Sequence, residues 1–234
     1  MQTTSTTETG RGGPRSFPGE STVEVGRTTA HERTLRTALP SRYLKYRRCF
    51  EVIATLLLLA LSLPLMGLIA LAIRLESLGP ALFHQQRVGV GGCPFTMLKF
   101  RSMYAIDDAG RAPVTIRNDP RITRVGRLLR ITHLDELPQL WNVLRGEMSL
   151  VGPRPEVAEM MEIYDTLIPD FWLRLQVPPG LTGLAQIRRG YADNLESTRR
   201  KLSDDLEYVR HISPLLDLLI ILRTVVVVIR MRGR

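Results

Sequence analysis

One segment of the sequence decides the class of fold: VIATLLLLALSLPLMGLIALAI, at residues 52–73. Its 22 residues carry no charge, and Glu51 and Arg74 bound it. A helix rises about 1.5 Å per residue, so a helix of this length would span a hydrocarbon core of about 30 Å. A cleaved signal peptide is not expected, because residues 1–48 precede the run and no small-residue cleavage pattern follows it directly. The sequence therefore predicts a membrane segment.

Pro64 lies near the middle of this segment, flanked by Ser62 and Gly67. A proline inside a helix removes one hydrogen bond and clashes with the carbonyl four residues back, so a sharp kink is expected. A break at Pro64 would leave arms of about 12 and about 9 residues, each reaching through only about half of the hydrocarbon. An ordinary spanning helix with a tolerated proline is the alternative. The charges favour re-entry weakly, because nine of the 32 basic residues precede the run and 23 follow it.

Residues 1–40 are predicted to form a disordered basic tail, because they are rich in Thr, Ser, Gly, Pro and Arg and lack hydrophobic periodicity. Residues 1–48 together carry nine Lys or Arg and four Glu. A basic cluster ends this part of the chain: Arg42, Lys45, Arg47 and Arg48. Its position beside the apolar run predicts contact with anionic lipid rather than with nucleic acid.

Two short strand-like runs follow the membrane segment, ALFHQQRV at 81–88 and PFTMLKF at 94–100. The residues between them include Gly89, Gly91 and Gly92, and the pattern predicts a β-hairpin. The glycines form neither GxGxxG nor GxxxxGK, so a nucleotide-binding loop is not expected there.

Cysteine and histidine usage argues against two further kinds of site. Cys49 and Cys93 are too few for a disulfide framework, which fits a reducing compartment. The four histidines form neither HExxH nor a Cys/His spacing, so a histidine-based metal site is not expected.

Two adjacent carboxylates, Asp135 and Glu136, stand within HLDELPQLWN at residues 133–142. Apolar residues recur after them at helical spacing, so one face of a following helix should be packed: Leu137, Leu140, Trp141 and Leu144. Asp is a preferred N-cap, and Pro138 is tolerated in a first turn. Capping alone would explain the acids, so evidence for a catalytic role has to come from the rest of the chain.

Basic residues recur around the acid pair, several of them in Pro- and Gly-rich stretches that are typical of shaped loops: Lys99, Arg101, Arg121, Arg124, Arg127, Arg130 and Arg154. Charges at this density usually form a solvated face. A guanidinium group, however, suits bidentate binding of phosphate. Acids at a helix start within a ring of arginines therefore predict a site for an anionic substrate with a bridging metal ion.

Four blocks of sequence follow in order: KFRSM (99–103), NDPRITRVGRLLR (118–130), LDELPQLWNVLRGEMSLVGPRPE (134–156) and PPGLTGLAQ (178–186). Together they resemble the bacterial sugar transferases, the monotopic phosphoglycosyl transferases. IALAIRLESLGPALFHQQRVG (69–89) is similar to the family's membrane exit and first hairpin. The resemblance covers about residues 45–230, and four ordered blocks are far more specific than any one of them.

This resemblance implies an enzyme that transfers a sugar-1-phosphate from a UDP-sugar to a polyprenyl phosphate such as undecaprenyl phosphate, releasing UMP and requiring Mg²⁺. Asp135 and Glu136 would be its catalytic acids. Asp135 would attack the phosphorus that carries the sugar, and the polyprenyl phosphate would then displace the covalent acyl phosphate. Glu136 would hold Mg²⁺ or assist proton transfer. The product would be the first lipid-linked unit of a surface polysaccharide or glycoconjugate.

Further residues take roles from the same resemblance. Arg130 and Arg154 are similar to the family's phosphate-binding arginines, and Lys99 and Arg101 to its basic cluster. His133 departs from the family, which commonly has serine there. The segment QIRRGYADN (186–194) is expected to contact sugar or uridine. The sequence does not identify the sugar.

The fold class implied by the resemblance is a mainly α-helical α/β monotopic membrane protein with a small β-hairpin and amphipathic interfacial helices. We expect a tail at 1–40, a re-entrant membrane helix at 41–75 and a catalytic domain at 76–234 on the cytoplasmic face of the inner membrane. The family breaks its helix near a Ser-Pro pair, whereas here Leu63 precedes Pro64 and Ser62 stands one place earlier. A homo-oligomer is compatible with this arrangement.

The end of the chain, LLDLLIILRTVVVVIRMRGR (215–234), is predicted to lie at the membrane interface. Asp217 and Arg223 leave uncharged runs that are too short to span a bilayer. Val225–Val228 alone would favour a strand, and the helix expected here depends on the resemblance. The last basic residues would face lipid headgroups: Arg230, Arg232 and Arg234.

Two other classes of function stay open on the sequence. A non-catalytic membrane adaptor that binds anionic lipid or a partner protein would explain the charge, but not the adjacent acids or the ordered Gly/Pro blocks. A membrane-tethered nucleic-acid-binding protein would need aromatic interleaving or a recognition helix, which the basic residues lack.

Overall fold

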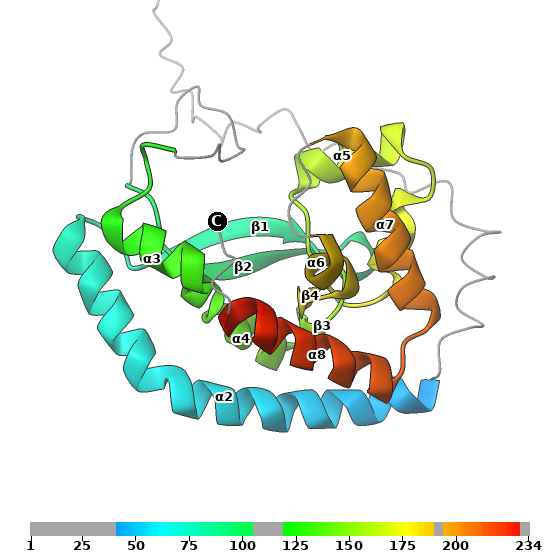
Figure 1. Ribbon diagram of the computed structural model, residues 1–234, viewed down its shortest axis with the longest axis horizontal. Helices are drawn as coiled ribbons and strands as arrows, with labels where there is room; N and C mark the ends of the chain where they lie inside the picture. Colours follow the sequence, from blue (N-terminus) through cyan, green and yellow to red (C-terminus); the bar gives the residue numbers. More distant parts are fainter. Residues whose placement is uncertain (1–40, 105–118, 190–193, 230–234) are drawn as a thin grey trace, which may run out of the picture. The chain divides into compact units, whose positions relative to one another are not determined.

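The computed structural model describes residues 41–104, 119–189 and 194–229. The predicted tail at residues 1–40 and the terminal basic residues Arg230, Arg232 and Arg234 lie outside the described residues. The described part is mainly helical and contains two small pairs of strands (Figure 1). The expectation of a mainly α-helical chain with a small hairpin is confirmed.

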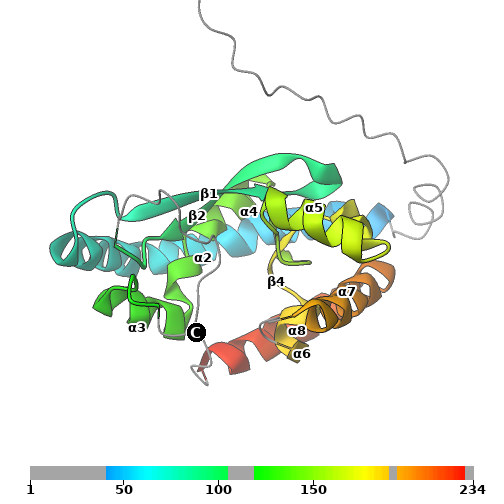
Figure 2. The ribbon, with the colours of Figure 1, turned by 90° about the horizontal axis from the view of Figure 1, so that it is seen from above.

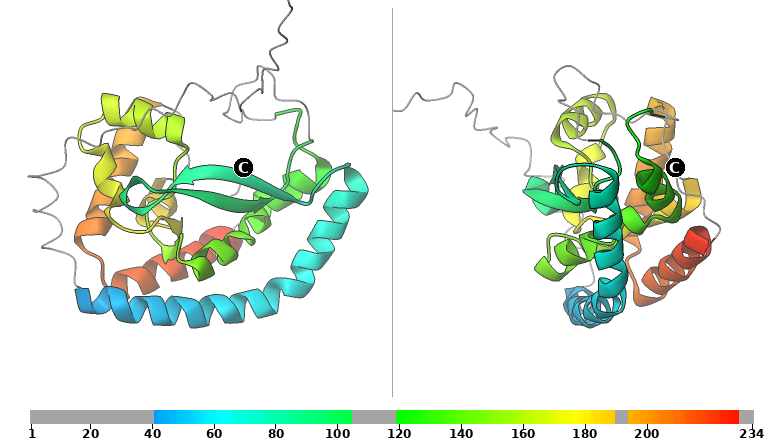
Figure 3. Two further views of the ribbon diagram at one scale, coloured as in Figure 1. Left: turned by 180° about the vertical axis from the view of Figure 1, so that it is seen from behind. Right: turned by 90° about the vertical axis from the view of Figure 1, so that its left-hand side faces the viewer.

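The membrane segment lies in α2 (Ser41–Glu76), a helix of 36 residues with Pro64 inside it. Its part Tyr46–Glu76 is long and apolar enough to cross a membrane, and only 11% of the apolar window is buried. α2 is continuous but changes direction along its length (Figures 1 and 3). Proline accounts for such a bend, because its ring pushes away the carbonyl of the preceding turn. The expected kink is therefore a bend within one helix rather than a break into two.

The first turns of α2 are joined to the rest of the chain by a buried ionic network. The Arg47 side chain is only 6% exposed, and its Nε lies 3.0 Å from Glu51 Oε1 and 3.3 Å from Asp217 Oδ2. Its Nη2 donates to Ser149 Oγ and to the Val151 carbonyl. These contacts bind α2 to β3 (Ser149–Val151) and to α8 (Pro214–Ile229).

Two tyrosines and a second arginine complete this junction. Tyr43 and Tyr208 donate to the two carboxylate oxygens of Asp217 at 2.6 and 2.8 Å. Arg48 donates to the Val143 and Leu144 carbonyls at 2.6 and 2.7 Å. The prediction that this basic cluster faces lipid is therefore wrong for Arg47 and Arg48. Apart from Glu51, their partners are far away in the sequence, so composition alone suggested free charges.

The other end of α2 is fixed as well. Glu76 accepts hydrogen bonds from the backbone amides of Arg124 and Val125, at the start of α3 (Arg124–Thr132). Arg101 donates to the Ser77 and Leu78 carbonyls just beyond α2, at 2.8 and 2.6 Å. These carbonyls follow the helix end, where backbone acceptors lack helical partners. α2 is thus tied at both ends to the rest of the chain.

The predicted hairpin is confirmed as the antiparallel pair β1 (Leu82–Val88) and β2 (Pro94–Phe100). The turn contains the short 3₁₀ helix η1 (Val90–Gly92), in which Gly91 has a φ of 65° and Gly92 a φ of 85°. Such positive φ values favour glycine over other residues. Figure 2 shows the hairpin and α8 on opposite sides of α2.

A second pair of strands brings two Gly- and Pro-rich blocks together. β3 runs parallel to β4 (Gly180–Thr182), with Ser149 opposite Gly180 and Val151 opposite Thr182. A Cβ added at Gly180 would lie 2.1 Å from the Gly152 nitrogen. Only glycine therefore permits this close approach of the two backbones.

The remaining elements surround this pair. They are η2 (Leu134–Glu136), α4 (Gln139–Arg145), α5 (Ala158–Leu167), η3 (Phe171–Gln176), α6 (Leu184–Arg189) and α7 (Leu195–Arg210). The main core joins apolar residues of β2, α4, β3, α7 and α8, among them Met97, Val143, Val151, Val209 and Ile220. Val225–Val228 belong to α8, so the helix expected there is confirmed and the strand is excluded.

Replacing Arg47 by Met should destabilise the protein strongly. The change leaves Glu51 and Asp217 as buried carboxylates without their shared cation, which costs about 3–5 kcal/mol. For a chain of this size we expect the midpoint of thermal unfolding in detergent, followed by circular dichroism, to fall by roughly 6–20 °C.

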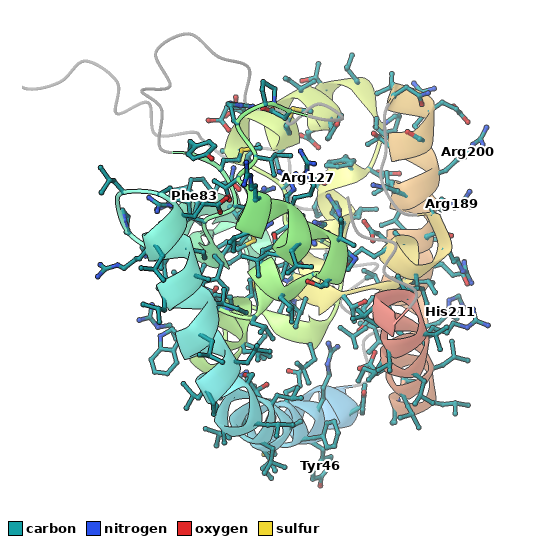
Figure 4. All side chains as sticks on the ribbon, turned by 60° about the vertical axis from the view of Figure 1, so that its left-hand side comes forward. Tyr46, Phe83, Arg127, Arg189, Arg200 and His211 are labelled. Atoms are coloured by element: carbon teal, nitrogen blue, oxygen red, sulfur yellow. The ribbon has the colours of Figure 1, made fainter. Side chains whose placement is uncertain are left out.

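Arg200→Met is the matched control, because Arg200 makes an exposed pair with Glu196 on α7 (Figure 4). Its midpoint should move by about 3 °C at most. Equal shifts in the two variants would show that the Arg47 network does not hold α2 in place.

Candidate active site

The acid pair lies in a tight connection between α3 and α4. α3 starts at the N-cap Thr123, whose hydroxyl accepts from the Gly126 amide at 2.8 Å. His133 ends this helix in the left-handed conformation, with a φ of 58°. Asp135 and Glu136 then form part of the 3₁₀ turn η2. The left-handed conformation of His133 therefore sets the direction of the chain between the end of α3 and the two acids.

The alternative explanation of the acid pair, that Asp135 caps the following helix, does not hold. Pro138 occupies the N-cap position of α4, and no side chain caps this helix start. Its fixed φ suits the turn that joins η2 to α4. The acids are therefore not explained by helix capping.

The predicted packed face of α4 is also only partly right. Leu140 is buried, whereas Trp141 is 48% exposed. The Arg145 guanidinium carbon lies over the Trp141 ring, 5.7 Å from its centroid. Asn142 is fully buried instead, because it accepts from the Leu98 amide at 3.0 Å and donates to the Thr96 carbonyl at 2.7 Å. A polar residue that bonds to the β2 backbone thus takes a buried place that hydrophobicity would not predict.

Glu136 is held by two basic side chains. Arg154 Nη2 lies 2.5 Å from Glu136 Oε1, and Lys99 Nζ lies 3.6 Å from the same oxygen. Burial alone would raise the pKa of Glu136, but the charges of Arg154 and Lys99 and the hydrogen bond from Arg154 lower it to about 2. Glu136 is therefore an anion at any physiological pH.

Asp135 is in a different electrostatic state. Its side chain makes no hydrogen bond or ion pair with any residue that the structure describes. Burial, and then the negative charge of Glu136, raise the pKa of Asp135, while Lys99, Arg154 and Arg130 oppose this rise. Glu136 is thus bound by neighbouring side chains, whereas Asp135 has free oxygens near the positive charges of Lys99, Arg130 and Arg154.

Lys99, Arg130 and Arg154 are brought together from three elements. Lys99 lies on β2, Arg130 in the last turn of α3, and Arg154 in the loop between β3 and α5. Burial, with the positive charge of Arg154 next, lowers the pKa of Lys99 to about 8. Three of the four predicted phosphate-binding residues therefore surround the acid pair.

Arg101, the fourth, has another set of contacts. Its guanidinium donates to Ser77 and Leu78, and a Cβ at Gly79 would lie 2.4 Å from Arg101 Nη1. A structural role at the end of α2 accounts for these contacts, and phosphate binding by Arg101 stays a prediction.

The segment predicted to contact sugar or uridine is described only in part, because residues 190–193 lie outside the described residues. Arg188 and Arg189 lie in α6 and are bound to α7: both reach Asp204, and Arg188 also pairs with Glu207 at 2.5 Å. These contacts fix α6 on α7. Sugar or uridine binding by this segment stays a prediction.

The residues fit Mg²⁺ only in a limited way. Among the residues that the structure describes, no group of three or more His, Cys, Asp or Glu side chains could enclose a metal ion. Mg²⁺ commonly uses one or two carboxylates together with substrate phosphates and water. Asp135 and Glu136 can supply this smaller set, although Arg154 and Lys99 already occupy Glu136 Oε1. The fit is therefore to an ion shared with a diphosphate rather than to an all-protein cage.

Sequence reasoning missed the support behind Arg154. Arg174 of η3 donates to the Arg154 carbonyl at 2.9 Å and to Asp205 of α7 at 2.7 Å. A signal was present, since Arg174 is the one charged residue in the run FWLRLQV at 171–177. A charge inside an apolar run suggests a buried partner.

Comparisons with known proteins agree with the resemblance seen in the sequence. The family described as "Bacterial sugar transferase" matches residues 42–231. The chain is 50% identical to the UDP-glucose:undecaprenyl-phosphate glucose-1-phosphate transferase of Caulobacter vibrioides over 181 residues, 76% of this chain and 68% of that protein.

Two longer relatives match this chain over less than half of their own length. An Escherichia coli protein with the same name is 47% identical over 176 residues, 74% of this chain and 38% of that protein. The UDP-N-acetylgalactosamine-undecaprenyl-phosphate N-acetylgalactosaminephosphotransferase of Aeromonas hydrophila is 41% identical over 196 residues, 83% of this chain and 46% of that protein. The chain therefore spans less than half the length of these two relatives.

The family match includes α2, the hairpin, the acid pair and the loop with Arg154. The resemblance stated from the four sequence blocks is thereby confirmed, and the chain belongs to the bacterial sugar transferase family.

Proposed function

We propose that this protein transfers a sugar-1-phosphate from a UDP-sugar to undecaprenyl phosphate and releases UMP. The observation that carries the proposal is the division of roles within the acid pair: Glu136 is clamped by Arg154 and Lys99, while Asp135 keeps free oxygens. Relatives at 41–50% identity are named for this type of reaction. Two of those with the higher identity are named for UDP-glucose, so UDP-glucose is the donor we expect first.

Asp135 is the proposed nucleophile. A carboxylate oxygen forms a bond to the phosphorus that carries the sugar, and the bond from this phosphorus to the oxygen of UMP breaks. An oxygen of the polyprenyl phosphate then attacks the same phosphorus and releases the Asp135 carboxylate. Each step exchanges one phosphorus–oxygen bond for another, so the enzyme ends unchanged.

The cations around the pair are needed because a carboxylate has to approach an anionic diphosphate. Lys99, Arg130 and Arg154 oppose the rise of the pKa of Asp135 that burial causes, and so favour its ionised form. The same groups are placed to bind phosphoryl oxygens and stabilise charge as it develops. Glu136 holds Arg154 and Lys99 in place without competing as a nucleophile, since both cations lie on its carboxylate.

Mg²⁺ is proposed as the cofactor, held by carboxylate oxygens of the acid pair, Glu136 in particular, together with the donor diphosphate. When bound, it would neutralise charge on the diphosphate and improve UMP as a leaving group.

The membrane arrangement is proposed from the apolar surfaces of two helices. α2 exposes many large apolar side chains, and α8 exposes others, among them Leu215, Leu218 and Leu222. We propose that α2 enters and leaves the membrane on the cytoplasmic side, helped by the bend that Pro64 causes, and that α8 lies at the interface. A lipid-borne phosphate and a soluble UDP-sugar can then meet at one site.

The reaction should depend on Asp135. Purified protein with Mg²⁺ and undecaprenyl phosphate should release UMP from UDP-glucose or another member of a UDP-sugar panel. Asp135→Asn should lower kcat by at least about 1,000-fold, because the amide cannot form the acyl phosphate. UMP release measured over time checks this.

Asp165→Asn is the matched control, since Asp165 is an exposed acid on α5. It should keep the activity of the wild type. Equal activity of Asp135→Asn and the wild type would exclude Asp135 as the nucleophile, and a silent wild type on the full panel would favour the adaptor function.

The pH dependence of kcat/KM for the donor should report the ionisation of the Lys99 ammonium group. Its pKa is lowered to about 8, so the ammonium is charged below this pH and loses its charge as the pH rises. We expect kcat/KM for the donor to fall above about pH 8, and Lys99→Arg to move this limb to higher pH because a guanidinium stays protonated. An unchanged alkaline limb in Lys99→Arg would mean that another group titrates.

The re-entrant arrangement makes a separate prediction. Single cysteines at positions 30 and 110, in a chain with Cys49 and Cys93 replaced by Ser, should both be protected from a membrane-impermeant reagent in intact cells. Both should react after the cells are opened. Reaction of one position in intact cells and of the other only in opened cells would show that α2 crosses the membrane.

A further inference from the structure

The loop that carries Arg154 is held from a side that the proposed chemistry does not use. The Arg154 side chain reaches Glu136, while its backbone carbonyl accepts a hydrogen bond from Arg174 Nη2 at 2.9 Å. Arg174 lies in η3, and its side chain is 6% exposed. One arginine therefore fixes the backbone of another whose guanidinium belongs to the site.

The orientation of Arg174 is set by several contacts. Its Nη2 also donates to Asp205 Oδ2 at 2.7 Å, and its Nη1 lies 3.5 Å from Glu156 Oε1. The guanidinium lies over the Phe171 ring, 5.0 Å from the centroid. A planar group held at these points keeps one orientation, which a lysine could not reproduce. Asp205, which is buried in α7, therefore helps to place Arg174 Nη2 within hydrogen-bond distance of the Arg154 carbonyl.

The same loop is also held by the hairpin. Arg87 Nη1 donates to the Pro155 carbonyl at 3.0 Å, and the Val88 amide donates to the Glu156 carbonyl at 2.9 Å. Gly152, Pro153 and Pro155 are buried. The loop is thus bound both by β1 and by the Arg174–Asp205 pair.

We propose that Arg174 and Asp205 are positioning residues that direct the Arg154 guanidinium toward Glu136 and the donor diphosphate. Neither makes a hydrogen bond or ion pair with Asp135 or Glu136 in the described part of the chain. They act through the backbone of Arg154. The expected effect of these residues on binding of the UDP-sugar rests on the proposed function. Their role in fixing the loop that carries Arg154 does not.

The test is a double-mutant cycle with Arg174→Lys, which keeps the charge but loses the planar fork. We expect kcat/KM for the UDP-sugar to fall by about 100-fold, the size expected for a misplaced binding group. The KM for undecaprenyl phosphate should stay unchanged. In an Arg154→Ala background, the further loss from Arg174→Lys should be less than about threefold, because both changes act through one side chain.

Two controls separate positioning from a general loss of structure. Arg200→Lys, at an exposed site on α7, should leave all kinetic constants unchanged. Asp205→Glu, which keeps a carboxylate facing Arg174, should recover part of the activity that Asp205→Asn loses. Equal losses from Arg174→Lys with and without Arg154 would overturn the inference.

Hydrogen exchange supplies a readout that does not need the reaction. In full-length protein, the amides of Gly152, Arg154, Glu156 and Val157 should exchange faster in Arg174→Lys than in the wild type, while those of α4 stay unchanged. Unchanged exchange in 152–157 would overturn the inference even if activity fell. If the wild type released no UMP from any donor, the proposed function would fail, and the exchange result would still decide whether Arg174 holds the loop.

Discussion

The buried contact of Arg47 with Glu51 and Asp217 is the constraint on which the arrangement of the chain depends. It joins the apolar helix α2 to β3 and α8, and Tyr43 and Tyr208 bind the same Asp217 carboxylate. Buried charges of this kind are stable only when each has its partner. Arg47 of α2 donates to the Val151 carbonyl, and β3 leads directly from there into the loop with Arg154. The position of α2 therefore affects the position of this loop.

The far end of α2 constrains the other half of the site. Glu76 binds the first amides of α3, and α3 ends immediately before His133 and the acid pair. The acid pair follows the segment bound to the end of α2, and Arg154 follows the strand bound to its start. The two parts of the site are thus connected to opposite ends of one helix. The proposed reaction joins a soluble donor to a lipid-borne acceptor, and a helix tied at both ends would hold the site at one position relative to the membrane.

Local patterns predicted the parts of the fold that depend on local physics. The uncharged run predicted α2, and the glycine-separated runs predicted the hairpin. The grouping of Lys99, Arg130 and Arg154 with the acid pair came from the family resemblance instead. The main failures concern partners that are distant in the chain. Arg47 and Arg48 looked like free surface charges, yet they bind β3, α8 and α4.

The same reason explains why α4 was misjudged. Helical spacing counts Trp141 as a core residue and Asn142 as a surface residue, and it does not include the backbone of β2. Once β2 lies alongside, its amide and carbonyl groups need partners, and Asn142 supplies both. Asp135 was likewise a candidate helix cap, but Pro138 takes the N-cap position of α4, so capping does not explain the acids.

The charges at the site also bear on why a metal ion would be useful there. Lys99, Arg130 and Arg154 bring three positive charges near the two carboxylates. A UDP-sugar carries a negative charge on each of its phosphoryl groups, so its arrival would offset these positive charges and raise the pKa of Asp135 further. The ionised form of Asp135, which the proposed attack requires, would then be less favoured. A divalent cation that entered with the diphosphate, as proposed, would remove this conflict, because it would supply positive charge without requiring another basic side chain next to Asp135.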